Sequence, residues 1–444
     1  MIRSNKLPFA RPDLTEEEFQ AVRRVMESGW ITSGPETDAF EQEFAQYIGA
    51  PDAAALNSAT AALHLGLVAL GIGPGDVVLV PALTFTATAE VVSRTGARPV
   101  LLDVDRNSYL LSPEIVESFL STCTYEAGEY RCKEGRVRAI ICVHYGGRVC
   151  DLDGLFEICR STGMELLQDA AHSFPSRDGE GKVGRRGPVT AFSFYATKNI
   201  TTGEGGMITG DQPEIIQRIR RMRLHGIATP AHRRAGWQYD VVEQGYKYNL
   251  SDIASAMGRV QLRRAEEMLQ KRKQIHEAYQ QAFAFLPGLR LCPEQEASAY
   301  HLYTLEIHGS SVAQYPNNSE GSATLDGPPR PDASPKQPNE ANQLQLQSGP
   351  TLQSPASGRS HAGLDRDDFV AAMEESRIGT GLHFIPLYRM SYYMEKYGLR
   401  SSQFPACEEI FESIVSLPIY SAMSEEDTRD VIEAVRNILS TTAE

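Results

Sequence analysis

Short apolar runs alternate with longer amphipathic stretches through the first half of the chain. The apolar runs predict strands over 53–58, 77–80, 100–104, 137–143, 164–168, 189–194 and 207–209. The amphipathic stretches predict helices over 13–28, 36–48, 113–120 and 152–162, and another that ends at Arg94. Strands that alternate with helices in this way favour an α/β fold, with a mostly parallel seven-stranded sheet between helices.

The pattern changes after residue 210. A basic helix over 211–223 and a polar stretch over 226–248 precede a long helix, which we expect to run from Ser251 to about Phe285. A smaller α+β region then begins at residues 300–307. It continues with a helix over 364–375, a strand over 379–384 and a last helix over 424–439.

A segment of biased composition interrupts this smaller region. Residues 309–362 hold eight of the 25 prolines and no Phe, Trp, Ile or Met, so they cannot bury enough apolar surface to offset their ordering entropy. We therefore divide the chain into a large domain (1–250), a linking helix with the start of the small domain (251–308), a disordered insertion (309–362) and the rest of the small domain (363–444). The polar loop 121–136 is a further insertion without recognisable chemistry.

Composition excludes several classes of function. The net charge of −14 over 444 residues argues against nucleic acid as a partner, because phosphate binding needs a basic surface. The N-terminus has no apolar signal region, and no apolar run approaches the roughly 20 residues that span a bilayer, so we expect a cytoplasmic protein. The seven cysteines show neither a disulfide framework nor metal-ligand spacing. Cys123 and Cys132 share one loop and could pair, although a reduced state is simpler.

Residues with chemical potential gather at the predicted strand ends. Ligands of parallel α/β sheets bind at the carboxyl ends of strands. The residues at or just beyond such ends are Phe85, His144, Asp169, His172, Ser193 and Lys198.

Lys198 lies on a turn between two predicted strands, followed by a turn rich in glycine (Gly203, Gly205, Gly206). A lysine in this position favours a lowered pKa or a covalent partner, because burial of an unpaired charge is costly. A plain loop lysine on a hairpin is the alternative. Upstream, Ser58-Ala59-Thr60 opens a helix, which is typical of an anion-binding N-terminus and equally of a simple N-cap.

These groups together match the needs of pyridoxal phosphate (PLP). The phosphate needs an anion site, which Ser58 to Thr60 and Ser193 supply. The ring nitrogen needs a carboxylate (Asp169), the ring face needs a flat neighbour (Phe85 or His172), and the aldehyde needs an amine (Lys198).

The chain resembles the DegT-type sugar-nucleotide aminotransferases, which have the aspartate-aminotransferase fold. The resemblance covers most of the chain and rests on the motifs G-W-I-T-S-G-P, N-S-A-T-A-A-L-H, D-V-D-R-N, Q-D-A-A-H, F-S-F-Y-A-T-K-N-I-T-T-G-E-G-G, G-Y-K-Y-N-L-S-D-I and I-G-T-G-L-H-F. It implies PLP fold type I, in which the chain has a large PLP-binding domain and a smaller C-terminal domain.

The resemblance also implies residue roles. Lys198 would bind the cofactor covalently and move protons, and Asp169 would pair with the ring nitrogen. Ala59, Thr60 and Ser193 would hold the phosphate, with Phe85 and His172 against the ring. Asn249 would reach the phosphate of a neighbouring subunit, which implies a homodimer with shared active sites. The expected substrate contacts are Trp30, Thr32, His383 and Tyr388.

Two positions depart from the family pattern. Gln168 stands where Glu is usual, and Tyr388-Arg389 stands in a substrate-facing loop where His is common. The second departure bears on which sugar is used.

The implied function is transfer of an amino group from glutamate to a nucleotide-linked keto-sugar, most specifically a UDP-4-keto sugar, in the synthesis of cell-surface polysaccharide or lipopolysaccharide amino sugars. Two alternatives remain. One is a PLP-dependent sugar dehydratase, against which Lys198 argues because those relatives carry His there. The other is a catalytically silent regulator on the same fold.

Overall fold

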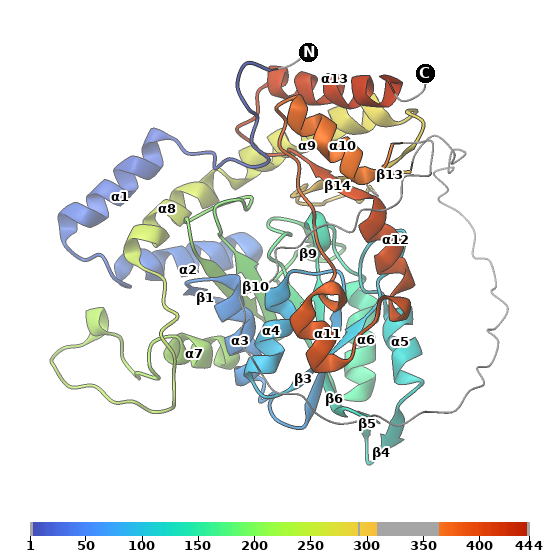
Figure 1. The fold of residues 1–444 in the computed structure, drawn as a ribbon. Helices are drawn as coiled ribbons and strands as arrows, with labels where there is room; N and C mark the ends of the chain where they lie inside the picture. Colours follow the sequence, from blue (N-terminus) through green and yellow to red (C-terminus); the bar gives the residue numbers. More distant parts are fainter. Residues whose placement is uncertain (1–2, 292–293, 309–363, 442–444) are drawn as a thin grey trace, which may run out of the picture.

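The computed structural model describes residues 3–291, 294–308 and 364–441 (Figure 1). The predicted disordered insertion therefore lies outside the described residues. The large domain is built on one mixed sheet, and the strand order of its main path confirms the seven expected strands. That order is β1 (Asp52–Leu56), β11 (Gly206–Gly210), β10 (Val189–Ser193), β7 (Glu165–Asp169), β6 (Gly135–Val143), β2 (Asp76–Pro81) and β3 (Arg98–Leu102).

Most of this sheet is parallel, as expected. Strands β10, β7, β6, β2 and β3 pair in parallel, and β11 runs antiparallel between β10 and β1. The parallel strands are buried along most of their length because helices cover the sheet. Two polar residues end strands at the same edge, Asp169 on β7 and Ser193 on β10.

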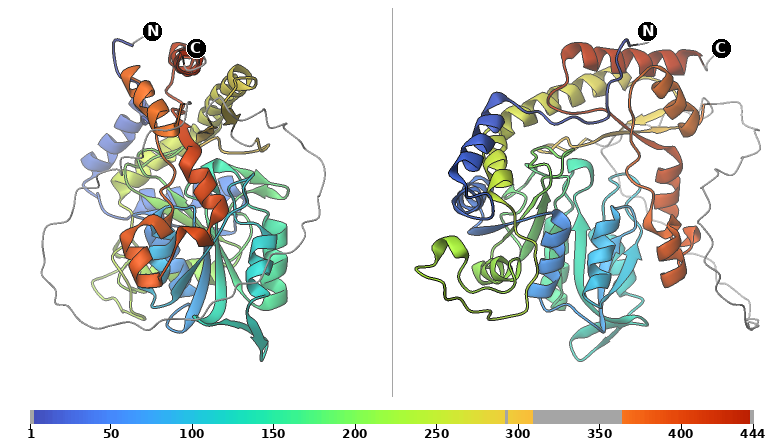
Figure 2. Two further views of the ribbon diagram at one scale, coloured as in Figure 1. Left: turned by 45° about the vertical axis from the view of Figure 1, so that its right-hand side comes forward. Right: turned by 60° about the vertical axis from the view of Figure 1, so that its left-hand side comes forward.

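Helices form layers against the sheet (Figure 2). Helix α3 (Ala59–Ala69) contacts α4 (Thr86–Arg94) and α7 (Pro213–Met222), and α5 (Pro113–Leu120) contacts α6 (Leu152–Thr162). Side chains cap three of these helices, since Ser58, Ser112 and Asp151 each accept a backbone N–H of the first turn. The cap at Ser58 fixes the start of α3 directly after β1.

The long helix expected from Ser251 is two helices, α8 (Asp252–Arg263) and α9 (Ala265–Phe283). They meet at Arg264, whose guanidinium donates to the carboxylates of Asp13 at 2.7 Å and Glu18 at 2.8 Å. Helices α1 (Glu16–Ser28) and α2 (Pro35–Ile48) pack along α8. The prediction of one helix was wrong, because apolar periodicity does not register ion pairs to a distant segment.

The small domain has a three-stranded antiparallel sheet, β12 (Leu289–Leu291), β13 (Tyr303–Ile307) and β14 (Ile414–Leu417). Helices α9, α10 (Arg366–Glu375) and α13 (Glu425–Thr441) lie beside it at the top of Figure 1. The strand expected over 379–384 is absent from the described residues. Only Gly381 pairs there, in one bridge to Ser416.

The sequence boundary of the small domain does not follow the packing. Helices α11 (Ser391–Tyr397) and α12 (Pro405–Ser413) belong by sequence to the small domain, yet their buried residues join the core of the large domain. Conversely, Leu7 near the N-terminus packs in the small-domain core. Each domain core thus contains residues that belong by sequence to the other domain.

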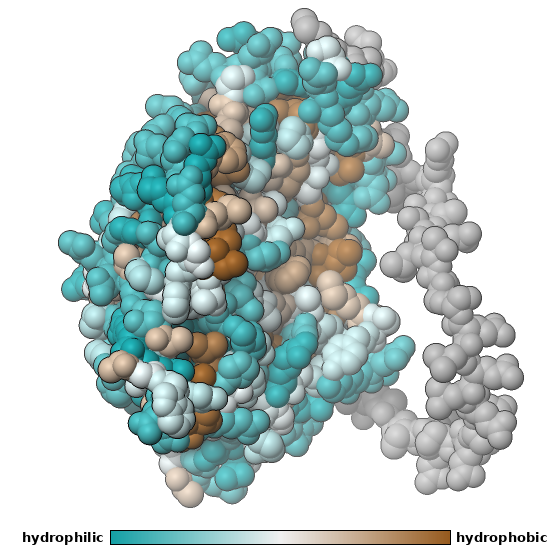
Figure 3. Space-filling model, turned by 90° about the vertical axis from the view of Figure 1, so that its left-hand side faces the viewer, coloured by the Kyte–Doolittle hydropathy of each residue, from teal (hydrophilic) through white to brown (hydrophobic). Residues whose placement is uncertain are grey.

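Two surface segments differ from their expected form. The loop 121–136 contains a hairpin of β4 (Thr124–Glu126) and β5 (Glu129–Cys132), which extends the large sheet. The stretch 226–248 projects from the body beside α7 (Figure 1), with a short 3₁₀ turn at Ala231–Arg233. Figure 3 shows apolar residues scattered over the side of the molecule that lies at the left of Figure 1. The exposed large apolar residues include Trp30, Ile31, Trp237, Tyr239 and Val241.

No helix among the described residues is long and apolar enough to cross a membrane.

Candidate functional site

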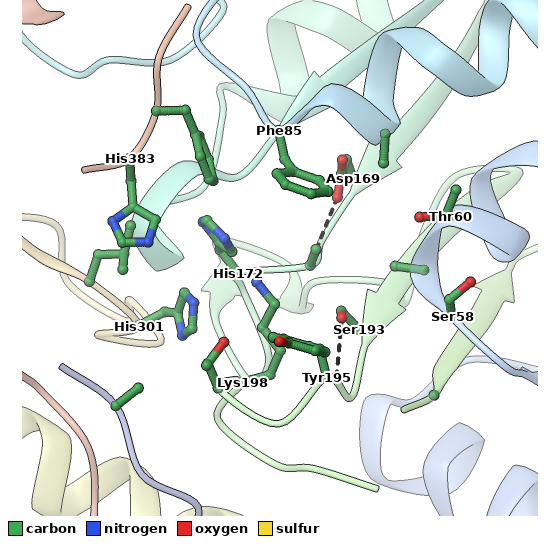
Figure 4. Close-up of a pocket in the computed structure, with 18 of the residues that line it drawn as sticks. Ser58, Thr60, Phe85, Asp169, His172, Ser193, Tyr195, Lys198, His301 and His383 are labelled. Carbon is green, nitrogen blue, oxygen red and sulfur yellow. Dashed lines mark hydrogen bonds between the residues drawn. The ribbon is translucent and has the colours of Figure 1, made fainter. Parts of the chain in front are cut away.

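A cavity of about 400 Å³ opens at the carboxyl ends of β7 and β10 (Figure 4). Its volume falls in the usual range for small-molecule sites. The lining contains every expected cofactor residue except Asn249: Ala59, Thr60, Phe85, Asp169, His172, Ser193 and Lys198. His383, an expected substrate contact, lines it as well.

Lys198 occupies the middle of this cavity. It follows β10 on a turn in which the Lys198 N–H donates to the Tyr195 carbonyl at 2.9 Å. Burial lowers the pKa of Lys198 from 10.5 to about 8, and attraction to Asp169 opposes that shift. Lowering the pKa raises the share of neutral amine near physiological pH, and the neutral amine is the form that attacks a carbonyl.

Asp169 ends β7 and is almost fully buried. Its carboxylate accepts Thr88 Oγ1 at 2.8 Å and the Ala171 N–H at 3.1 Å. Burial raises the pKa of Asp169, while the two hydrogen bonds and Lys198 oppose that change. A buried carboxylate of this kind favours a cationic partner, and a protonated pyridine nitrogen is one.

Behind Asp169, Gln168 is held on both sides. Its Nε2 donates to the Arg186 carbonyl at 2.8 Å, and its Oε1 lies 3.2 Å from His144 Nε2. The neutral amide satisfies one acceptor and one donor at once. Gln168 is therefore fully used as a packing residue behind Asp169.

The expected anion site lies at the other end of the cavity. The N-terminus of α3 brings Ser58, Ala59 and Thr60 to the lining, opposite Ser193 (Figure 4). Unpaired N–H groups at a helix N-terminus favour an anion. Ser58 Oγ is the N-cap and accepts the Ala61 N–H at 3.1 Å, which confirms that interpretation, while the anion site at this serine stays a prediction.

The Gly-rich turn supports this end of the cavity by close packing. A Cβ atom on Gly206 would stand 2.5 Å from the Ser58 carbonyl carbon and 2.6 Å from the Ala59 nitrogen. Only glycine lets β11 approach the start of α3 so closely.

Three histidines line the end of the cavity opposite the anion site: His172, His301 and His383 (Figure 4). The ring centroids of His172 and His301 are 4.4 Å apart. Burial lowers the pKa of all three, to about 4 for His383, so they are neutral near pH 7. Sequence analysis missed His301. Its only signal was a histidine directly before the strand in Y-H-L-Y.

The two expected ring neighbours differ in their surroundings. His172 is buried and stacks on Phe384 at 5.6 Å between ring centroids. Phe85 lines the cavity but remains 57% exposed. Its ring therefore stands at the mouth, where a bound planar group could cover it.

Three expected site residues lie outside the cavity and gather around Ser33. Trp30 Nε1 donates to the Ser33 carbonyl at 3.1 Å, and Asn249 Nδ2 donates to Ser33 Oγ at 2.7 Å. The Thr32 carbonyl accepts the Asp252 N–H at 3.1 Å. We call Trp30, Thr32, Ser33 and Asn249 the Ser33 cluster. All four residues are at least partly exposed.

Tyr388 does not reach the cavity. It is buried in the core, where its ring stacks on Phe404 at 4.4 Å between centroids. The sequence placed it in a substrate-facing loop, but the 3₁₀ turn Leu387–Arg389 directs its ring toward α12. The structure therefore does not support a substrate contact for this residue.

The fold also brings together a set that sequence spacing did not reveal. Possible ligand atoms of Cys142, His144 and Cys150 lie within 4.8 Å of one another, all buried. His144 Nδ1 already accepts the Cys150 N–H at 3.2 Å, and its Nε2 contacts Gln168. A metal ion would have to displace these hydrogen bonds, so we describe the set as packing behind Asp169.

The residues of the cavity fit PLP. An anion site, a buried carboxylate and an amine of lowered pKa stand along one cavity, in the order that phosphate, ring nitrogen and aldehyde require (Figure 4). When bound, the cofactor would supply an electron sink for the substrate carbon.

Comparison with known proteins agrees with this fit. The DegT/DnrJ/EryC1/StrS aminotransferase family matches residues 12–317 and 337–436. The chain is 36% identical to the spore coat polysaccharide biosynthesis protein SpsC of Bacillus subtilis, over 98% of each chain.

Solved structures give the same result. A putative sugar aminotransferase of Streptococcus pneumoniae, Spr1654 in its PLP form, is 27% identical with a TM-score of 0.77, over 98% of this chain and 99% of that one. The aminotransferase TlmJ of Streptoalloteichus hindustanus gives the same identity and TM-score over 100% of both chains. The protein is thus a PLP-dependent aminotransferase, a member of the DegT/DnrJ/EryC1/StrS family.

Proposed function

We propose that this enzyme transfers the amino group of glutamate to a nucleotide-linked keto-sugar, and that the acceptor is a UDP-4-keto sugar. The observation that carries the proposal is the position of Lys198, with a pKa of about 8, between an anion site and a polar wall of neutral histidines. The names of SpsC, a polysaccharide biosynthesis protein, and of Spr1654, a putative sugar aminotransferase, support a sugar acceptor. A role in cell-surface amino-sugar synthesis follows from the same names.

The residues of this chain divide the work along the cavity. Ala59, Thr60 and Ser193 hold the phosphate, and Asp169 keeps a proton on the ring nitrogen. Lys198 Nζ takes a proton from the α-carbon of glutamate and later returns one to the sugar carbon that receives the amino group. Because one amine performs both transfers, the two substrates use the same cavity in turn.

We further propose that the Ser33 cluster serves the cavity of a second copy of the chain. Asn249 and Trp30 match motifs of the family's site, yet in one chain they lie outside the cavity. The stretch 226–248 meets Trp30 through the ring of His232 and exposes Trp237 and Tyr239, which favours an interface. Each subunit would then supply the catalytic lysine of one site and Asn249 of the other.

A lysine at position 198 favours transamination over dehydration, because it can carry a proton to and from the substrate carbon. Cytoplasmic location stays a prediction from the sequence.

The amino-donor and amino-acceptor half-reactions test the reaction separately. Enzyme carrying the aminated cofactor is mixed with UDP-, TDP- and GDP-linked 4-keto and 3-keto sugars, and the return of the unaminated cofactor is followed by absorbance. We expect turnover with UDP-4-keto sugars and with glutamate in the reverse half. Turnover of 3-keto sugars alone, or of non-UDP sugars alone, would contradict the proposed acceptor.

Mixed dimers test the shared site. Lys198→Ala and Asn249→Asp should each be nearly inactive, the second because a carboxylate would face the phosphate. After unfolding and refolding together in equal amounts, about a quarter of wild-type activity should return, because half of the dimers are mixed and each has one intact site. Recovery is absent if both residues serve the same site.

A further inference from the structure

His301 lies two residues before β13 and lines the cavity next to Lys198 and His172 (Figure 4). It is 6% exposed. It lies outside the motifs that carry the family resemblance. Its hydrogen bonds determine which of its ring nitrogens carries the proton.

The amide of Asn199 sets the tautomer of His301. Asn199 Nδ2 donates to the carbonyls of Phe174 at 2.9 Å and Ala299 at 2.7 Å, so its Oδ1 is an acceptor. His301 Nδ1 lies 2.9 Å from that Oδ1 and must therefore donate a proton to it. A neutral imidazole has one proton, which leaves His301 Nε2 as an acceptor.

The surroundings keep His301 neutral. Burial lowers its pKa, and the positive charges of Lys198 and Arg272 lower it further. The adjacent His172 has the opposite tautomer, because its Nδ1 accepts the Gly146 N–H at 3.3 Å and leaves Nε2 to donate. The polar wall beside Lys198 thus includes donors at Lys198 and His172 and an acceptor at His301.

A keto-sugar offers a matching donor. In a 4-keto-6-deoxyhexose, the carbonyl carbon is flanked by a carbon that carries a hydroxyl and one that carries the terminal methyl group. The expected phosphate site lies at the far end of the cavity from the histidines, so the space beside Lys198 that the cofactor phosphate leaves free is bounded by His301 (Figure 4). A hydroxyl next to the carbonyl would then meet His301 Nε2.

We infer that His301, through its unprotonated Nε2, accepts a hydrogen bond from the hydroxyl adjacent to the carbonyl of the sugar substrate, and that Asn199 is the positioning residue that sets this tautomer. The inference rests on the proposed function. It assigns the acceptor sugar a specific contact that glutamate, which has no such hydroxyl, does not use.

The first test reads the tautomer without any reaction. Nitrogen-15 spectra of full-length protein labelled at histidine, assigned with His301→Phe, should show His301 Nε2 unprotonated and Nδ1 protonated from pH 6 to 8. Asn199→Ala should remove that preference. A protonated Nε2 at pH 7 in the wild-type protein overturns the inference, whatever sugar the enzyme uses.

The second test separates the two half-reactions. His301→Phe keeps a flat ring but removes the acceptor. We expect kcat/KM for a UDP-4-keto-6-deoxyhexose to fall about 10- to 100-fold, with the glutamate half-reaction changed less than about threefold and partial rescue in His301→Gln. The 3-deoxy analogue of the sugar should react equally with the wild type and His301→Phe.

His276→Phe is the matched control, because His276 is buried against Tyr300 and Tyr303 outside the cavity. It should leave both half-reactions unchanged. Equal loss in both half-reactions of His301→Phe would show that His301 serves Lys198, and no loss would show that it touches no substrate; both results overturn the inference. If the wild type accepts no keto-sugar at all, the proposed function fails, and the tautomer measurement still decides the state of His301.

Discussion

The cavity around Lys198 and the Ser33 cluster both carry residues of the expected active site, but their surroundings are opposite. In the cavity, strand ends and a helix N-terminus place the main groups, and the Asp169 carboxylate accepts two hydrogen bonds from its own chain. The residues of the Ser33 cluster are at least partly exposed, and they bond to one another and to the neighbouring Lys247 and Asp252. The difference teaches that one chain brings the residues of the cavity together, whereas the place of the Ser33 cluster in the site stays a proposal that depends on a second copy of the chain.

The largest effect on activity is expected for Lys198→Ala, which removes a group of the cavity and leaves the Ser33 cluster unchanged. Loss of the group that moves the proton should lower kcat at least about 1,000-fold, and the visible absorbance of the lysine-bound cofactor should disappear. Thermal unfolding and subunit assembly should stay close to wild type, because the Ser33 cluster is untouched. Lys271→Ala, at an exposed ion pair, is the control. Retained turnover in Lys198→Ala would show that Lys198 is not the catalytic lysine.

Gly206→Ala should damage the cavity through packing alone. The added Cβ would meet the Ser58 and Ala59 backbone at 2.5 to 2.6 Å, so the start of α3 must move. We expect about 1–3 kcal/mol loss in unfolding free energy and weaker cofactor binding by titration. Gly179→Ala, which meets nothing within 4 Å, should be neutral. Unchanged cofactor affinity in Gly206→Ala would place the phosphate elsewhere.

The rate at which the protein binds the cofactor should depend on pH, because the amine of Lys198 must be neutral to react. The pKa of Lys198 is lowered from 10.5 to about 8, so the protein without cofactor loses this proton more readily than the unfolded chain. The rate of capture, followed by absorbance in stopped flow, should rise with pH to a plateau above about 8 and fall about tenfold per pH unit below it. By linkage, this group makes the unfolding free energy increase with pH between 8 and 10.5. A midpoint near 10 would mean that the amine is solvated.

Asn249→Ala should have the smallest effect. Removal of one hydrogen bond to a phosphate should weaken cofactor binding about tenfold, while leaving the lysine-bound absorbance of the saturated enzyme intact. Equilibrium titration measures this change. An effect as large as that of Lys198→Ala would place Asn249 in the same reaction centre, and the distinction between the two regions would be lost.

Much of the cavity followed from local pattern. Asp169, Ser193 and the Ser58–Thr60 turn sit at the ends of apolar runs, and parallel strands must bring such ends to one edge. His301 was missed because its role depends on Asn199, about a hundred residues away, and on the amide orientation there. Tyr388 was misplaced because residues near it in sequence say nothing about Phe404. The helix break at Arg264 likewise depends on Asp13.

The sequence by itself determined the alternation of strands and helices, the strand-end polar groups and the motifs of the family, because these depend on residues close together along the chain. Only the tertiary structure decided which segments pack in the core of the other domain. It also decided which histidine lines the cavity as an acceptor, and which expected site residues lie outside the cavity. Those features depend on contacts between distant segments, where side-chain direction and burial are set by packing rather than by local period.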